Sequence, residues 1–446
     1  MLKGNLLCLT ILALNTALSS STFAQPSTLI NLSDEQLAET TGQALMSLSY
    51  IAPTDKANLE TARNGGDKNI GFYKLGMEAE LELNTNIKRL QLGCGGVNGS
   101  GACDIDIENL SLSGLKLDAK GEPLDMTREE RAQSSAKLTN PFIEFAVKNP
   151  GSASTREIKG FRVSAEKVVG LMTLGLSNDD TPSYGIRSLS GYLKLASASG
   201  TAKTIERPMT QAIGDMTGRI LIQNAFPLSS SPRNFVSDKF NLTLYEASVP
   251  FSTAPIVVSG SRMSKVNLNA TAVIPQIDFA GPLDATINVA GFIPITLGKN
   301  VTGKITNLTA DITIDESLGM IHKIPVNGNP FSLSLQSQKI QWANAAAPAE
   351  RGWWMAFEND IKLGDVTPSK GIKIEDALLK QVLPKVNDYL YANYITCNGY
   401  SGCLGGDLPI TDPINLSGQR VTLPLENLKL GAQSFQPNCY GSLKFC

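Results

Sequence analysis

Histidine is nearly absent from this sequence, which excludes most of the chemistry that imidazole carries. His322 is the only histidine in 446 residues, so acid–base catalysis or metal binding by imidazole has one residue at most to use. No Gly-x-Ser-x-Gly motif indicates a serine nucleophile. We interpret His322 as a surface or strand-end residue beside Lys323. We expect no catalytic residues, and a protein that is not an enzyme.

Charge is also scarce. Asp, Glu, Lys and Arg make up 18% of the residues, and 39 basic residues balance 41 acidic ones to a net charge of -2. A nucleic-acid partner bound through bulk charge is therefore excluded, because such binding needs concentrated basic residues. Glycine-rich phosphate loops and heptads are absent, and we expect no cofactor. A hydrophobic content of 42% is enough for the cores of two or three domains.

Long hydrophobic runs are missing as well, apart from one at the N-terminus. Lys3 precedes an apolar stretch from Leu6 to Leu18, and Thr22-Phe23-Ala24 offers small residues for signal peptidase. The stretch falls short of the ~20 residues that a membrane-spanning helix needs. We predict a signal peptide at 1–24 and a mature chain without a transmembrane segment. The protein is expected to be exported, either to the cell surface or to the periplasm.

Six of the seven cysteines follow the predicted cleavage point, in three close pairs. In an oxidising compartment such pairs indicate a disulfide framework. Glycine-rich spacers favour closing each pair locally, and a bridge over about ten residues is worth roughly 2.5–3 kcal/mol. A zinc site is disfavoured, because no spacing is Cys-x-x-Cys and no histidine is near, so we expect no metal ligands. The predicted pairs are Cys94 with Cys103, Cys397 with Cys403, and Cys439 with Cys446.

Alternation of polar and apolar residues dominates the chain and predicts β-strands. Residues 77–84 alternate strictly, and we expect them to form a hairpin with 105–107 whose tip carries the first bridge. Three apolar pairs recur from residue 105 to residue 117, and the alternation shifts by one residue around Asn109 and again around Gly114. The pairs are Ile105/Ile107, Leu110/Leu112 and Leu115/Leu117. A bulged strand or a turn of a β-solenoid would each explain these changes.

Further strands are expected downstream. Residues 142–147 are bounded by the turn signals Asn140-Pro141 and Asn149-Pro150. Between 266 and 314, short strands in a meander or sandwich are predicted, because Pro275, Pro282 and Pro294 interrupt the apolar pattern. The predicted fold class is all-β, mainly an antiparallel sandwich or elongated meander, with solenoid-like coils as the alternative.

Two helices are expected in addition. One is a short N-terminal helix at 34–40, and the other covers 374–392, where Pro384 predicts a kink or a division into two helices. We expect the apolar side of the second helix to pack onto a sheet. The expected regions are 1–24 (signal peptide), 25–118 (N-terminal β region), 119–137 (charged excursion), 138–370 (main β region) and 371–446 (helix and disulfide-rich region).

Two clusters are candidates for binding. Trp353 and Trp354 are adjacent, so on a strand one would point inward and the other outward, where it could form an interaction surface. The second cluster is a set of carboxylates on the strands near the first bridge, which would bind calcium or form a solvated face; we favour the solvated face. Its members are Glu78, Glu80, Glu82, Asp104, Asp106 and Glu108.

Three stretches resemble a known group of proteins. They are Leu32-Ser33-Asp34-Glu35-Gln36-Leu37 with Thr41-Gly42-Gln43, then Gly71-Phe72-Tyr73-Lys74-Leu75-Gly76, and Asn140-Pro141-Phe142-Ile143-Glu144-Phe145. Together they resemble the pilus-system ("Fil"-type) exported surface proteins of Acinetobacter-like, Gram-negative bacteria, over most of the first 200 residues. The resemblance implies association with a pilus or filament system and supplies no catalytic residues.

The expected function is therefore a non-enzymatic structural, accessory or adhesive component of a pilus-related cell-surface system. Its expected partners are other pilus or cell-envelope proteins, with a host or surface ligand as a further candidate. The sequence also leaves open a periplasmic, β-rich carrier of a hydrophobic ligand, in which helix 374–392 would act as a lid.

Overall fold

The computed structural model describes residues 45–178, 185–225, 231–289, 293–328, 331–426 and 428–438. The chain divides into two units, Met1–Met46 and Ser47–Cys446, and apart from Met46 the described strands and helices belong to the second. Three expectations lie outside the described residues: the signal peptide at 1–24, the helix at 34–40, and the bridge between Cys439 and Cys446. Strands make up 57% of the described residues, which confirms the all-β fold class.

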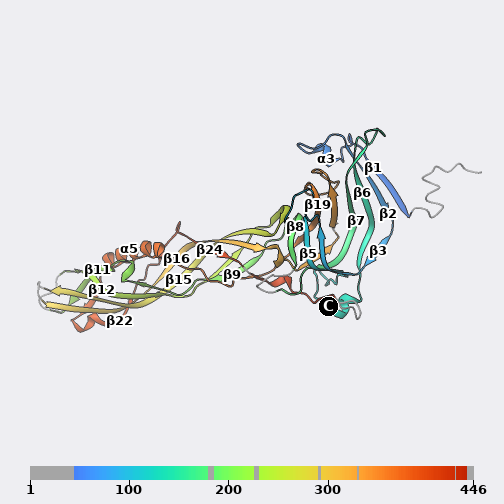
Figure 1. Ribbon diagram of the computed structural model, residues 1–446. Helices are drawn as coiled ribbons and strands as arrows, with labels where there is room; N and C mark the ends of the chain where they lie inside the picture. The colour runs from blue at the N-terminus through green and yellow to red at the C-terminus, as the bar shows by residue number, and fades with distance from the viewer. Residues whose placement is uncertain are drawn as a thin grey trace, which may run out of the picture. The chain divides into compact units, whose positions relative to one another are not determined.

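Twelve strands form the first sheet (Figure 1). Its main path is β1 (Met46–Ile51), β2 (Ile70–Met77), β6 (Ala136–Lys148), β7 (Glu157–Thr173), β18 (Phe331–Gln336), β19 (Gly352–Ile361), β8 (Ile186–Leu195), β5 (Ile105–Ser113) and β4 (Thr85–Leu92). Three more strands branch from it: β3 (Glu80–Leu83) on β6, β14 (Ile256–Met263) on β8, and β17 (Lys323–Asn327) on β7. Because β5 also pairs with the end of β7, the strands β5, β7, β18, β19 and β8 close into a ring.

The N-terminal hairpin differs from the prediction in its first strand. β4 pairs with β5, and the Cys94–Cys103 disulfide joins the residues that connect them, whereas β3 pairs with β6. The alternation continues from β3 into β4, so the pattern alone could not show which half pairs with β5. Asn109 lies inside β5 at φ 50°, where the pairing with β4 is interrupted. The pairs on both sides of Asn109 keep the same register, so no residue is inserted, and β5 is one continuous strand. Neither a bulge against β4 nor a solenoid turn explains the phase change; it coincides with the left-handed backbone of Asn109.

The second sheet has nine strands and is built on one long hairpin. Its path is β21 (Ile395–Asn398), β11 (Thr217–Gln223), β12 (Arg233–Leu244), β15 (Lys265–Val289), β16 (Ile293–Ser317) and β22 (Leu404–Pro409), with β10 (Arg207–Thr210) on β12 and both β23 (Ile414–Asn415) and β24 (Arg420–Leu425) on β16. β15 and β16 each contain 25 residues and pair antiparallel over their whole length (Figure 1). Each would extend roughly 80 Å when straight.

The prediction of short strands between 266 and 314 is wrong. Prolines do not interrupt β15 and β16, because a strand tolerates a residue without an N–H group wherever that side of the strand has no partner. Pro275 precedes the segment of β15 that pairs with β12, and Pro294 precedes the segment of β16 that pairs with β22. Pro282 lies inside the β12-paired segment, between the paired residues Ala280 and Leu283, where the pairing with β12 is interrupted. Similarly, β6 continues through Asn140-Pro141, with Asn140 at φ 48°, so those residues do not bound a strand as predicted.

The C-terminal helix is a single element, α5 (Asp376–Ala392), which contains Pro384 and is not divided in two. It packs against β11, and six of its apolar side chains are buried in the same core as those of β12 and β15. This confirms that its apolar side packs on a sheet. The buried side chains are Leu378, Leu379, Val382, Leu383, Val386 and Leu390.

Smaller elements complete the fold. Four strands form a third sheet in the order β13 (Ser248–Ser252), β9 (Ser199–Lys203), β20 (Val366–Thr367) and β25 (Lys429–Leu430). Two short helices are α3 (Leu59–Ala62) and α4 (Arg128–Ala132), and the 3-10 turns are η1 (Gln211–Ile213), η2 (Leu318–Met320), η3 (Ser401–Cys403) and η4 (Gly431–Gln433). Thr127 and Glu130 form a capping box at α4, so the charged excursion contains a helix that was not predicted although the Thr-x-x-Glu signal is present.

Candidate binding surface

The twelve-stranded sheet carries apolar side chains in register across one face. Leu75 of β2 lies opposite Ile143 of β6, which lies opposite Val163 of β7, and Val163 lies opposite Leu333 of β18. Leu75, Ile143 and Val163 are 38%, 41% and 46% exposed. Three neighbouring strands thus present a row of aliphatic side chains to solvent, at positions where a β-sheet domain usually buries such residues.

An aromatic row runs beside it. Tyr73 of β2 lies opposite Phe145 of β6, and Phe145 lies opposite Phe161 of β7. The row ends at Trp353 of β19, whose ring meets that of Phe161 edge-on at 5.9 Å between centroids. At the other end, Tyr50 of β1 stacks on Tyr73 with centroids 4.5 Å apart. We call the two rows and the adjoining side chains of β1 the apolar face: Leu48, Tyr50, Tyr73, Leu75, Ile143, Phe145, Phe161, Val163, Leu333, Leu335 and Trp353.

The opposite face of the same strands is covered. The segment 337–351, between β18 and β19, places Trp342 against Phe72 of β2 with ring centroids 5.6 Å apart. Trp342 is 2% exposed. Beneath this segment, Arg162 of β7 donates a hydrogen bond to Glu144 of β6 at 2.5 Å and another to the carbonyl of Ala343 at 2.9 Å. One face of the sheet is therefore closed by the chain itself, and the apolar face is the one that stays accessible.

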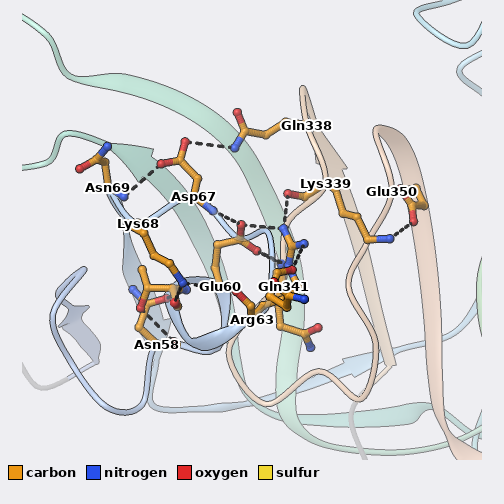
Figure 2. A network of polar contacts seen from close by, with 12 residues as sticks. Asn58, Glu60, Arg63, Asp67, Lys68, Asn69, Gln338, Lys339, Gln341 and Glu350 are labelled. Carbon is orange, nitrogen blue, oxygen red and sulfur yellow. Dashed lines mark hydrogen bonds and ion pairs between the residues drawn. The ribbon is translucent and has the colours of Figure 1, made fainter.

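A polar network holds segment 337–351 in place (Figure 2). Glu60 of α3 is completely buried and accepts hydrogen bonds from the backbone N–H groups of Asp67 and Gln341, at 2.8 and 2.6 Å. Arg63 binds both oxygens of Glu60 and also donates to the carbonyl of Lys339. The segment before β2 and the segment before β19 are thus joined through one carboxylate. Because four donors converge on it, Glu60 is a strong anchor for the covering segment.

A cavity of about 390 Å³ lies on this covered face. Burial raises the pKa of Glu144 and lowers the pKa of Arg162, while the attraction between the two charges opposes both shifts. Burial also raises the pKa of Glu358, which accepts a hydrogen bond from the N–H of Ala346 at 3.3 Å. Lys74, at the cavity rim, pairs with Glu166 at 2.7 Å. The ionic groups mainly neutralise one another, so the cavity is suited to holding the covering segment in register.

The edge of the sheet at β1 lies beside the apolar face. β1 ends the main strand path, and among the described residues no strand pairs with its outer side. The residues from Met46 to Ile51 contain no charge and no proline, the features that usually protect a sheet edge from pairing with another chain. Leu48 is 73% exposed. An extended segment could therefore pair with this edge and contact the apolar face with alternate side chains.

The residues singled out from the sequence occupy different positions. Trp353 is half-buried on the apolar face, whereas Trp354 is 3% exposed and packs against the covering segment. Cys94–Cys103 and Cys397–Cys403 form disulfides, as predicted. His322 immediately precedes β17, as a strand-end residue would, but it is 1% exposed, so the expectation of a surface position is wrong. Its Nδ1 lies 2.9 Å from the carbonyl oxygen of Leu174, in the core rather than in a site.

The acidic residues do not converge on a calcium site in the described part of the chain, where no cluster of three metal-ligating side chains occurs. Five of the six pair instead with separate cations: Asp106 with Arg89, Asp104 with Arg262, Glu108 with Arg187, and Glu80 and Glu82 with Lys137. Asp104 and Asp106 are 1% and 8% exposed, so the expectation of a solvated face is wrong for these two residues. The sequence pattern showed the alternation but not the basic partners, of which Arg262 is more than 150 positions away along the chain.

Comparison with known proteins gives no relatives. The chain matches no protein-family model, and neither the curated proteins nor the solved structures contain a similar one. Within the described residues, no helix combines the length and the apolar character that crossing a bilayer requires.

Proposed function

We propose that this protein is a non-catalytic structural, accessory or adhesive component of a pilus-related cell-surface system. It would bind a partner protein of that system through the apolar face, with a strand of the partner added to the edge at β1. The observation that supports this most is the conjunction of an uncharged sheet edge with in-register rows of exposed aliphatic and aromatic side chains. Backbone pairing would supply affinity and the rows would supply specificity.

Two further observations are consistent with the proposal. The disulfides are typical of exported proteins, since the cytosol keeps thiols reduced. The resemblance of residues 71–76 and 140–145 to pilus-system surface proteins falls on β2 and β6, the strands that carry most of the exposed aliphatic row. The carrier alternative has less support, because α5, the expected lid, buries its apolar side chains in the core.

The test is photo-crosslinking in intact cells of the native bacterium. A photoreactive amino acid would replace Leu48 or Ile143, and control positions would be Val236 and Val273, which are similarly exposed but belong to the nine-stranded sheet. We expect crosslinks from Leu48 and Ile143 to a filament subunit, identified by mass spectrometry, and none from the controls. Ser49→Pro should weaken the crosslink from Ile143, because a proline in an edge strand discourages pairing with another chain.

Equal crosslinking at all four positions, or crosslinks from Leu48 and Ile143 only to proteins unrelated to filaments, would contradict the proposal. Crosslinking to a second copy of the same chain would replace the proposed partner by self-association.

A further inference from the structure

A second cavity, of about 110 Å³, lies between β4, β5, the end of β7 and the segment 435–438. Among the described residues that line it there is no aspartate or glutamate, but there are two cations, Lys88 and Arg128. Asn109, whose left-handed conformation interrupts the pairing of β4 with β5, also lines it.

Lys88 and Arg128 differ from the cations around them. Their neighbours are paired: Arg89 with Asp106, and Lys116 with Glu130. Neither Lys88 nor Arg128 has an acidic group within 4 Å in the part of the chain that the structure describes. Two cations thus face one cavity whose described lining includes no carboxylate to offset their charge.

A third positive charge lies directly behind the cavity wall. Arg131 of α4 is completely buried, and its hydrogen bonds go only to hydroxyl and carbonyl oxygens, with no carboxylate among its described partners. Burial lowers the pKa of Arg131 to about 10, so the side chain remains cationic at neutral pH. A buried cation without a counter-ion is costly, and an anion close by would offset part of that cost.

Two hydroxyl groups connect Arg131 to the cavity. Ser111 Oγ accepts a hydrogen bond from Arg131 Nη2 at 2.9 Å, and Thr173 Oγ1 accepts one from Nη1 at 3.0 Å. The two hydroxyl oxygens lie 2.6 Å apart, so one of their two protons is shared between them. The other proton remains available for donation, and both residues line the cavity. The wall therefore offers an O–H donor that is polarised by a guanidinium.

The cavity also contains an acceptor. Asn438 Oδ1 is buried and has no hydrogen-bond partner among the described residues, while its Nδ2 donates to Asn84. A ligand that satisfies both this acceptor and the surrounding donors must carry negative charge and also a proton on oxygen. Monohydrogen phosphate has both, whereas sulfate at neutral pH has only the charge.

From this arrangement we infer that the cavity is a site for inorganic phosphate, in which Lys88 and Arg128 bind the monohydrogen phosphate dianion, the Ser111–Thr173 hydroxyl pair donates to it, and Asn438 accepts from its P–OH group. The site is separate from the apolar face, so it can be tested independently of the proposed function. Its small volume fits the free ion, which, unlike the dianion of a phosphate ester, keeps a P–OH group at neutral pH.

The experiment is isothermal titration of the mature, oxidised protein with inorganic phosphate at pH 7, followed by sulfate and glycerol 3-phosphate. Variants Lys88→Gln, Arg128→Gln and their double would be compared with the double control Lys239→Gln/Arg233→Gln, which removes the same charge from exposed residues of β12. All four positions are on the surface, and circular dichroism would verify folding. Thermal unfolding with and without phosphate gives a second readout, because a ligand that binds only the folded state raises Tm.

We expect one saturable phosphate site, about tenfold weaker in each single variant and undetectable in the double variant, with the control unchanged. Sulfate should bind more weakly than phosphate. Glycerol 3-phosphate, whose dianion has no P–OH group, should likewise bind more weakly than phosphate, and equal or tighter binding would overturn the proposal. Absence of saturable binding, equal binding by the double variant, or sulfate binding as tightly as phosphate would overturn the proposal.

Discussion

The twelve-stranded and nine-stranded sheets solve the problem of a unique register in different ways. The twelve-stranded sheet buries ionic groups: Arg162 with Glu144, and Asp104 with Arg262. The long hairpin of the nine-stranded sheet instead alternates between buried apolar and exposed polar side chains, with one phase change in each strand, between Ile274 and Ile277 and between Ile305 and Leu308. Its buried carboxylate is Glu316. A buried charge tolerates one arrangement of its partners, because leaving it unpaired is costly. A strand pair held together only by apolar alternation can shift by two residues and still bury the same face. The register of such a pair therefore depends on the lengths of the two strands and on the elements packed against them.

The difference has a functional counterpart. In the twelve-stranded sheet, charges and the covering segment 337–351 occupy one face, which leaves the apolar face accessible. In the nine-stranded sheet, the apolar side of the hairpin is covered by α5 and its neighbours. The exposed apolar rows thus occur in the twelve-stranded sheet, where buried polar contacts set the strand register. That region can expose hydrophobic side chains without depending on them for its fold.

The largest expected effect is loss of the buried ion pair. Arg162→Met should reduce the free energy of unfolding by about 3–5 kcal/mol, because Glu144 would stay buried without its partner. The loss should be greater at pH 8 than at pH 5, since removal of Arg162 raises the pKa of Glu144 further and protonation at low pH relieves the cost. Urea denaturation followed by fluorescence measures both values.

The matched control is Arg420→Met in the nine-stranded sheet, where Arg420 pairs with Asp311 on the surface and we expect little change. The double variant Arg162→Met/Glu144→Leu should recover most of the stability. If Arg162→Met were no more destabilising than Arg420→Met, the polar interior would not distinguish the two regions.

The next effect concerns Glu316, a carboxylate buried within the nine-stranded sheet. Burial, together with the charges of Glu426 and Asp315, raises the pKa of Glu316 to about 7. Between pH 4.5 and about 7 the unfolded chain loses this proton while the folded chain keeps it, so stability falls as pH rises. Above pH 7 the loss of unfolding free energy caused by ionised Glu316 levels off at about 3 kcal/mol.

Glu316→Gln should remove this dependence, because the amide oxygen can still accept the hydrogen bond from Leu428 N–H. The variant should therefore exceed the natural protein in stability at pH 8 and equal it at pH 4. Parallel stability profiles from pH 4 to 8 would show that Glu316 does not titrate in this range.

The smallest difference is between the two disulfides, one in each region. Their loops have sequence separations of 9 and 6, and the chain-entropy model gives about 2.5 kcal/mol for each. Replacing both cysteines by serine should cost more for Cys94–Cys103, because Asn98 in that loop donates to Asp104 and to the carbonyl of Arg351. Thermal unfolding of the two double variants measures the difference, and a larger loss for Cys397–Cys403 would contradict it.

Local patterns in the sequence were sufficient for the fold class, for α5 and for the two local disulfides. Each of these depends on residues close together in the chain. Strand length was not predictable in the same way. Whether Pro275 or Pro294 ends a strand depends on whether another strand pairs with the side of the strand on which the proline lacks an N–H group. That other strand is specified elsewhere in the sequence.

The binding surface was predictable only at one position. Adjacent tryptophans indicate one residue on each side of a strand, and Trp353 does lie on the apolar face. The rest of that face requires β2, β6, β7 and β18 to be neighbours, and no short-range pattern specifies this order. The buried network around Glu60 and Gln341 likewise joins positions 281 residues apart.

The pairing of β16 has a consequence for biogenesis. Its outer side is completed by β22, β23 and β24, which run parallel to it and come from residues 404–425, near the end of the chain. During synthesis or export from the N-terminus, the long hairpin would emerge with one side unpaired until these last strands arrive. Truncations before residue 404 should therefore aggregate rather than yield a smaller soluble protein, and an escort that shields this side would be needed only for a short time.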